Sequence, residues 1–192
     1  MYLTHNLQEL IMNKSNKKLI FIHIPKCAGS YVASILSYLK IQNKGHTLAL
    51  PNEGITFTVI RNPVERFESL LNYRLNEKEP RIDWPIQLNY VYKDKSISLN
   101  EIVSKMTDKQ ILGFDPYKTL TYWIKNIDII ITIDELPKLL EHFGYKYDLN
   151  LFPRANISNK KRDKFNIESY NKIKRLYNDD MILYNNVINS KF

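Results

Sequence analysis

The chain has 192 residues, 44% of them hydrophobic, which is enough for one substantial core and too little for two full domains. Its 28 lysines and arginines outnumber 20 acidic residues, and the net charge of +8 favours a polyanionic partner such as a nucleotide, a nucleic acid or a sulfated glycan. One cysteine, Cys27, excludes an internal disulfide, and four scattered histidines give no spacing typical of a zinc site, so no metal is predicted. We predict one domain over residues 1–192, with residues 1–17 as a flexible N-terminal segment. The polar start and the lack of a long apolar run predict a cytoplasmic protein without a transmembrane segment.

The first predicted unit is a strand, a tight turn and a helix. Residues 18–24 form an almost unbroken apolar run that stops at Pro25, which is typical of a buried parallel strand. Apolar side chains then recur at helical spacing over residues 29–39.

The same order recurs twice further along the chain. The β-branched residues 55–60 predict a strand, and Pro63 suits the first turn of a helix that follows it. A third strand is predicted over residues 127–133, followed by a helix with Asp134 as N-cap that ends near Gly144. Strands that alternate with helices predict an α/β fold, with a central parallel sheet flanked by helices in three layers.

The remaining segments connect or follow these units. Residues 75–98 contain Pro80 and Pro85 and are predicted to form an insertion loop, after which Ser98 and Glu101 form a capping-box pattern for a short helix. The chain is predicted to close with one amphipathic helix. Its packing face carries Tyr170, Ile173, Tyr177, Met181, Tyr184 and Val187.

The turn at residues 25–30 has the composition of an anion site. A loop between a buried strand and a helix N-terminus presents unpaired backbone N–H groups and the positive end of the helix dipole. Gly29 would let the backbone approach a ligand closely, Ser30 adds a hydroxyl donor and Lys26 adds a mobile positive charge. The alternative is an ordinary strand-to-helix turn with a surface lysine.

Cys27 suggests a nucleophile, since positive charge beside a thiol at a helix start favours the thiolate. A phosphotyrosine-type phosphatase would need an arginine six positions later, where this chain has Ala33. A small buried thiol is the better interpretation.

The second turn supplies the side chain best matched to a phosphate. Arg61 ends the second predicted strand, and Ser69 follows in the next helix. Arginine donates two parallel hydrogen bonds to a phosphate. Turns that follow neighbouring parallel strands lie at one sheet edge, so the two turns together suit a nucleotide with phosphates at both ends. Arg66, in the same helix, is either an ion-pair or packing residue or a ligand contact.

Both turns carry motifs that resemble a known family. "FIHIPKCAGS" resembles the 5′-phosphosulfate loop of the carbohydrate and heparan-sulfate-type sulfotransferases, and "VIRNPVERFESLL" resembles their 3′-phosphate motif. The resemblance extends to "TIDELPKLLEHFG" and to "NIS" with the basic residues after it, and so covers about residues 18–188. It implies a P-loop-like fold that binds 3′-phosphoadenosine 5′-phosphosulfate without a metal. The enzyme would transfer the sulfuryl group to a hydroxyl or amine of a glycan, a glycolipid or a small metabolite and release adenosine 3′,5′-bisphosphate.

The resemblance also implies roles for individual residues. Lys26 would contact the phosphosulfate bridge and assist catalysis, Arg61 and Ser69 would bind the 3′-phosphate, and Ser158 and Lys161 would belong to a loop that closes over the cofactor. The first turn would surround the 5′-phosphate with Cys27, Ala28, Gly29, Ser30 and Tyr31. Two of these depart from the family pattern, because Cys27 replaces a common threonine and Tyr31 a small hydroxyl residue. The chain is also short for the family, which suggests an acceptor site built largely from residues 75–98.

His46 is the only histidine between the two motifs, and related enzymes carry a catalytic base in this interval. An imidazole titrates near neutrality and therefore suits proton abstraction from a hydroxyl. The alternative is a surface histidine, with Glu65 or Glu68 as the base, although both are expected on an exposed face. His23 lies in the first predicted strand and is expected to be structural.

Two alternative functions remain for a basic α/β protein of this kind. A nucleotide or small-molecule kinase is disfavoured because its loop, Gly-x-x-x-x-Gly-Lys-Ser/Thr, is absent and the lysine precedes the glycine. A basic nucleic-acid-binding module would interleave aromatic residues with the basic run near residues 159–165, which supplies only Phe165. We therefore predict an enzyme with no nucleic-acid partner.

Overall fold

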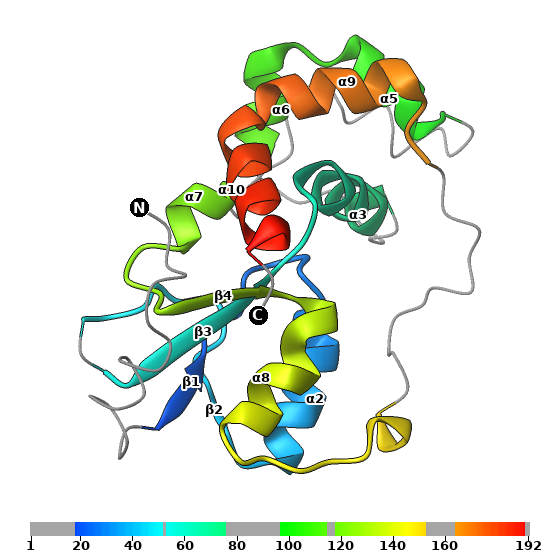
Figure 1. The fold of residues 1–192 in the computed structure, drawn as a ribbon. Helices are drawn as coiled ribbons and strands as arrows, with labels where there is room; N and C mark the ends of the chain where they lie inside the picture. Colours follow the sequence, from blue (N-terminus) through cyan, green and yellow to red (C-terminus); the bar gives the residue numbers. More distant parts are fainter. Residues whose placement is uncertain (1–17, 52, 76–96, 115–117, 153–163, 191–192) are drawn as a thin grey trace.

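A computed structural model describes residues 18–51, 53–75, 97–114, 118–152 and 164–190. Within these ranges the chain is an α/β protein with a four-stranded parallel sheet in the order β2-β1-β3-β4, flanked by helices (Figure 1). The strands are β1 (Leu19–Phe21), β2 (Gln42–Asn43), β3 (Ile55–Ile60) and β4 (Ile129–Thr132). The predicted α/β fold with a parallel sheet is confirmed. Two of the predicted strands are shorter than expected, and β2 was not predicted.

The parallel register brings the ends of β1 and β3 to the same edge of the sheet. Leu19 pairs with Ile55 and Phe57 pairs with Ile129, so that β3 lies between β1 and β4. All six residues of β3 are buried, as expected for a central parallel strand. The chain leaves β1 for β2 on one side and returns to β3 on the other. Such a switch in direction creates a crevice outside the carboxyl ends of the two strands.

Helices cover both faces of the sheet because alternate strand residues point to opposite sides. Leu19, Phe21 and Phe57 pack under α2 (Gly29–Tyr38) and α8 (Leu136–His142). On the other face, Ile24 and Ile60 pack with α7 (Leu120–Trp123) and α10 (Asn178–Asn189). Figure 1 shows α2 and α8 on one side of the sheet and α7 and α10 on the other. Each fully buried apolar side chain in these layers contributes about 1.5–3 kcal/mol.

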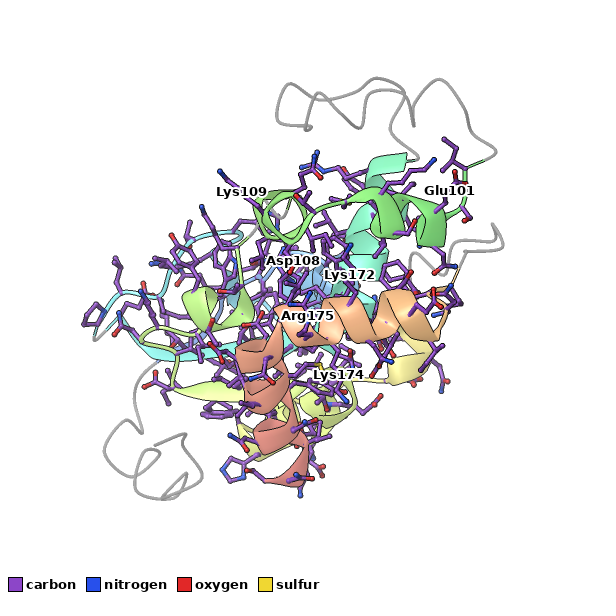
Figure 2. All side chains as sticks on the ribbon, turned by 90° about the horizontal axis from the view of Figure 1, so that it is seen from above. Glu101, Asp108, Lys109, Lys172, Lys174 and Arg175 are labelled. Carbon is purple, nitrogen blue, oxygen red and sulfur yellow. The ribbon has the colours of Figure 1, made fainter. Side chains whose placement is uncertain are left out.

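A group of helices beyond the sheet has its own core. It comprises α3 (Pro63–Leu75), α5 (Leu99–Lys105), α6 (Asp108–Phe114) and α9 (Ile167–Leu176), around buried residues such as Phe67, Leu71 and Ile102. Figure 2 shows Lys172 and Arg175 of α9 beside Asp108 of α6. Lys172 Nζ donates to the carbonyls of Val103 at 2.9 Å and Met106 at 2.6 Å, where α5 ends, and Arg175 pairs with Asp108 at 2.8 Å. The charged side chains of α9 therefore hold α5 and α6 against α9.

The prediction of one closing helix is wrong, because the helix breaks at Tyr177 into α9 and α10. No glycine or proline marks the break. Asp180, in the first turn of α10, is buried and accepts hydrogen bonds from the backbone N–H groups of Leu120 at 2.7 Å and Thr121 at 3.0 Å. These are orphan donors at the start of α7, so the carboxylate caps a distant helix. The predicted packing face is confirmed, with α9 serving the helical core and α10 also serving the sheet.

Two capping predictions have different outcomes. The Ser98 side chain accepts from the N–H of Glu101 at 3.2 Å and begins α5, as predicted. Asp134 is not an N-cap. Thr132 and Glu135 instead cap a short 3-10 turn, η2 (Ile133–Glu135), and α8 begins only afterwards. Nearly all of the predicted insertion at residues 75–98 lies outside the described residues. In the ranges that the structure covers, no helix has both the length and the apolar character needed to cross a bilayer.

Candidate functional site

The first turn holds two non-glycine residues in the left-handed backbone region. Lys26 has φ 65° and Ala28 has φ 63°, and α2 begins immediately after Ala28. No side chain of the described residues caps this helix, whereas Asn62 caps α3 and Asn166 caps α9. A left-handed residue costs about 1–3 kcal/mol, and an uncapped helix start leaves N–H groups without intrahelical acceptors. Free N–H groups at a helix start can bind an anion, and strained backbone is found most often at functional sites.

Arg66 holds the first turn in place from α3. Its side chain is buried, and Nε donates to the carbonyl of Pro25 at 3.1 Å while Nη2 donates to the carbonyl of Lys118 at 2.9 Å. Of the two alternatives for this residue, the structure shows packing and backbone contacts. It ties the first turn to α3 and to the segment that enters α7.

We predict that Arg66→Ala lowers the free energy of unfolding by about 3 kcal/mol, because the carbonyls of Pro25 and Lys118 lose a charged donor and the buried side chain leaves a cavity. Urea denaturation monitored by circular dichroism would measure the loss. Arg175→Ala is the matched control. Its pair with Asp108 is exposed, with 63% of the arginine side chain accessible, so its loss should cost less than about 1 kcal/mol. Equal losses in the two variants would contradict the bracing role of Arg66.

Lys26 reaches across to the helix that begins at the second turn. Its Nζ lies 3.9 Å from the ring centroid of Tyr73 on α3. Residues four apart share a helix face, so Tyr73 lies on the same face as Ser69 and Glu65. Arg61, directly after β3, donates from Nε to Glu65 Oε2 at 3.1 Å. The structure therefore places the predicted residues Lys26, Ser69 and Arg61 along one face of α3.

The other residues of the first turn divide into buried and exposed ones. Cys27 is buried in the sheet core, as expected for a small buried thiol, and its N–H donates to the Ile24 carbonyl at 3.3 Å. Ala28 and Ser30 of this turn are exposed. The structure gives Gly29 a reason that the sequence did not. A Cβ at this position would lie 1.6 Å from His23 Nε2, so the imidazole of His23 fills the space beside the glycine.

His23 and His46 form a pair beside the start of α2. Their ring centroids lie 4.4 Å apart at an interplanar angle of 61°. Burial lowers the pKa of His23 to about 4, helped by repulsion from His46, and burial also lowers the pKa of His46 although much of its side chain is exposed. Both imidazoles are therefore neutral at pH 7, and His46 is in the protonation state of a base. His23 was expected to be only structural, and its contact with His46 was not predicted.

A cavity lies beside Tyr31, the first residue after the turn at residues 25–30. We call it the Tyr31 pocket. It has a volume of about 380 Å³ and is lined by Tyr31, Ile133, Asp134, Leu136, Pro137, Tyr147 and Phe152. The Tyr147 hydroxyl is buried and has no hydrogen-bond partner among the described residues, and burial and the neighbouring Tyr31 raise its pKa. The pocket was not predicted, because Tyr147 and Phe152 belong to no motif.

The two candidate glutamate bases differ in their surroundings. Glu65 is exposed and paired with Arg61 at the site. Glu68 was expected to be exposed, and this is wrong. It is buried and accepts hydrogen bonds from Lys164 Nζ at 3.0 Å and from the N–H of Phe165 at 3.1 Å. Its carboxylate therefore binds the two residues, Lys164 and Phe165, that precede α9.

The predicted closing residues Ser158 and Lys161 lie outside the described residues. Within the described part of the chain, no three His, Cys, Asp or Glu side chains come together as a metal site. Comparisons of the chain with protein-family models, curated proteins and solved structures found no match.

Proposed function

We propose that the chain is a sulfotransferase of P-loop-like three-layer fold that uses 3′-phosphoadenosine 5′-phosphosulfate. One observation carries the proposal. β1 and β3 are parallel neighbours, so the two motif turns meet at one sheet edge, and Lys26 of the first turn rests on the helix that begins at the second. Turns after neighbouring strands meet in any parallel sheet, but here both turns carry a cationic side chain, Lys26 and Arg61, along one face of α3, which favours a shared anionic ligand.

The residues present fit both ends of such a nucleotide. The uncapped start of α2 and Lys26 suit the 5′-phosphosulfate, and Arg61 and Ser69 suit the 3′-phosphate. The Tyr31 pocket suits the adenine ring, because all of its lining side chains except Asp134 are aromatic or apolar and its volume of about 380 Å³ lies within the range of ligand pockets. In this arrangement Tyr31 contacts the base, which accounts for an aromatic residue in place of a small hydroxyl residue.

The residues at the site can support direct transfer of the sulfuryl group from the donor to an acceptor. An acceptor oxygen attacks the sulfur, the bond from sulfur to the bridging phosphate oxygen breaks, and the acceptor proton passes to His46. Lys26 and the N–H groups of α2 stabilise the negative charge that develops on the departing phosphate, as positioned donors do in phosphoryl transfer. The acceptor is a hydroxyl or amine of a glycan, a glycolipid or a small metabolite.

Ligand binding tests the proposal before any acceptor is known. Thermal unfolding would be recorded with adenosine 3′,5′-bisphosphate, with ATP and Mg²⁺, and with a single-stranded oligonucleotide. A ligand at 100 times its dissociation constant should stabilise the fold by about 2.7 kcal/mol, and we expect this only with the bisphosphate. Stronger stabilisation by ATP would favour the kinase, and by the oligonucleotide the nucleic-acid-binding module. Transfer of a labelled sulfuryl group to pooled acceptors would then identify the substrate.

A further inference from the structure

The imidazole of His23 touches three parts of the site. One face stacks on Phe21 at a centroid distance of 5.9 Å and an interplanar angle of 18°. Nε2 points at Gly29, where the backbone of α2 starts, and leaves no room for a Cβ. The ring also meets His46 in an edge-to-face contact. His23 is therefore fixed by the core and by α2, while its partner His46 is exposed on a loop.

The backbone of His23 also fixes the loop that carries His46. Its N–H donates to the carbonyl of Gly45 at 3.0 Å, and the N–H of Gly45 in turn donates to Asn43 Oδ1 at 2.9 Å. Gly45 has φ 64°, so the chain turns sharply just before His46. The backbone position and one side of the His46 ring thus both depend on residue 23.

We propose that His23 is a positioning residue whose ring holds the imidazole of His46 beside the first turn. This inference rests on the proposed function, in which His46 accepts the acceptor proton. Packing against a fixed ring restricts the rotamers that a histidine on a loop can occupy, only some of which point toward the site. The contact selects one of them and shields one side of the ring from water.

The charges around the pair allow this contact to persist at neutral pH. The pKa of His23 is about 4, so a neutral ring faces His46 when His46 takes up a proton. On the loop itself, Lys44 and Glu53 pair with each other. The first turn contributes Lys26, and the first turn of α2 contains no acidic residue. Burial lowers the pKa of His46, and the His23 ring, with its centroid 4.4 Å away, is one of the groups that bury it.

Proton NMR of the histidine ring hydrogens tests the contact without any assay of activity. In the wild type, His46 should titrate below 6.5. His23→Ala removes the shielding ring, and the His46 midpoint should rise toward 6.5. His23→Phe keeps a ring of similar shape, and the midpoint should stay low. His142, an exposed residue at the end of α8, is the internal control, and its ring hydrogens should behave in the same way in the wild type and in both variants.

An unchanged His46 midpoint in His23→Ala, or an equal rise in His23→Phe, would overturn the proposal. If His23→Ala does not fold, Gly29→Ala displaces the same ring and should produce the same rise. In transfer assays, His23→Ala should lower kcat about 10-fold with little change in KM for the donor, and the midpoint of the pH profile should follow the NMR midpoint. A wild type that binds no bisphosphate and transfers no sulfuryl group would refute the proposed function even if the titrations behave as expected. A wild type that transfers sulfuryl groups while the His46 midpoint stays fixed in His23→Ala would refute this inference alone.

Discussion

Replacing His46 by alanine is expected to lower the turnover number for sulfuryl transfer by about 10²- to 10⁴-fold. A hydroxyl acceptor with a pKa far above 7 does not lose its proton unaided as the oxygen attacks. His46 lies beside the start of α2 through its contact with His23. The fold and the affinity for adenosine 3′,5′-bisphosphate should be preserved, because the His46 side chain is exposed and contributes little to the core.

The pH profile gives the His46 variant a second signature. A base acts only when deprotonated, so kcat/KM of the wild type should rise with pH through the pKa of His46 and then level off. Burial lowers this pKa, which places the midpoint of the rise below 6.5. The alanine variant should lose this limb. His142→Ala is the matched control and should behave as the wild type. Near-normal turnover in His46→Ala would move the base to Glu65, since Glu68 is buried and bound by Lys164.

Lys26→Ala is expected to reduce the rate of transfer more than the affinity for the donor. The charge of Lys26 matters most when negative charge builds on the bridging oxygen, so its loss acts mainly on the transition state. We expect kcat to fall about 10²- to 10³-fold and the donor dissociation constant to rise about 10-fold. Stopped-flow binding and single-turnover transfer would separate the two effects.

A second lysine serves as control for Lys26. Lys125, after α7, lies 5.7 Å from the ring centroid of Tyr122 and so reproduces the lysine–tyrosine contact outside the two motifs. Lys125→Ala should change neither rate nor affinity. Equal losses of rate and affinity in Lys26→Ala would show that this residue only binds the donor.

The sequence predicted those elements of the fold whose signals lie within the segment itself. The β-branched run before Arg61 gave β3, and Pro63 gave the start of α3, because both signals are local. The strand β2 has two exposed polar residues and therefore no apolar pattern. The break at Tyr177 was also missed. Asp180 caps a helix start about sixty positions away in the chain, and no local signal records such a contact.

The same distinction between local sequence signals and long-range contacts applies to the site. Alternation of strands and helices placed Lys26 and Arg61 at one sheet edge, and the structure agrees. A further reason for Gly29, the space it leaves for the ring of His23, was not predicted because it depends on where that ring points. The burial of Glu68 depends on a partner that is 96 positions away. Long-range side-chain contacts of this kind cannot be read from motifs.

The most direct test of a shared bisphosphate site is a calorimetric titration of two ligands into the wild type, one variant and one control variant. Adenosine 3′,5′-bisphosphate and adenosine 5′-monophosphate would each be added to the wild type and to Arg61→Ala, with Glu65→Gln as control because Glu65 pairs with Arg61. In the wild type, the 3′-phosphate should add about 2 kcal/mol, or about 30-fold in affinity. In Arg61→Ala this difference should largely disappear, so that the bisphosphate binds about as weakly as the monophosphate. Wild-type affinity of Arg61→Ala for the bisphosphate would contradict a site that joins the two turns.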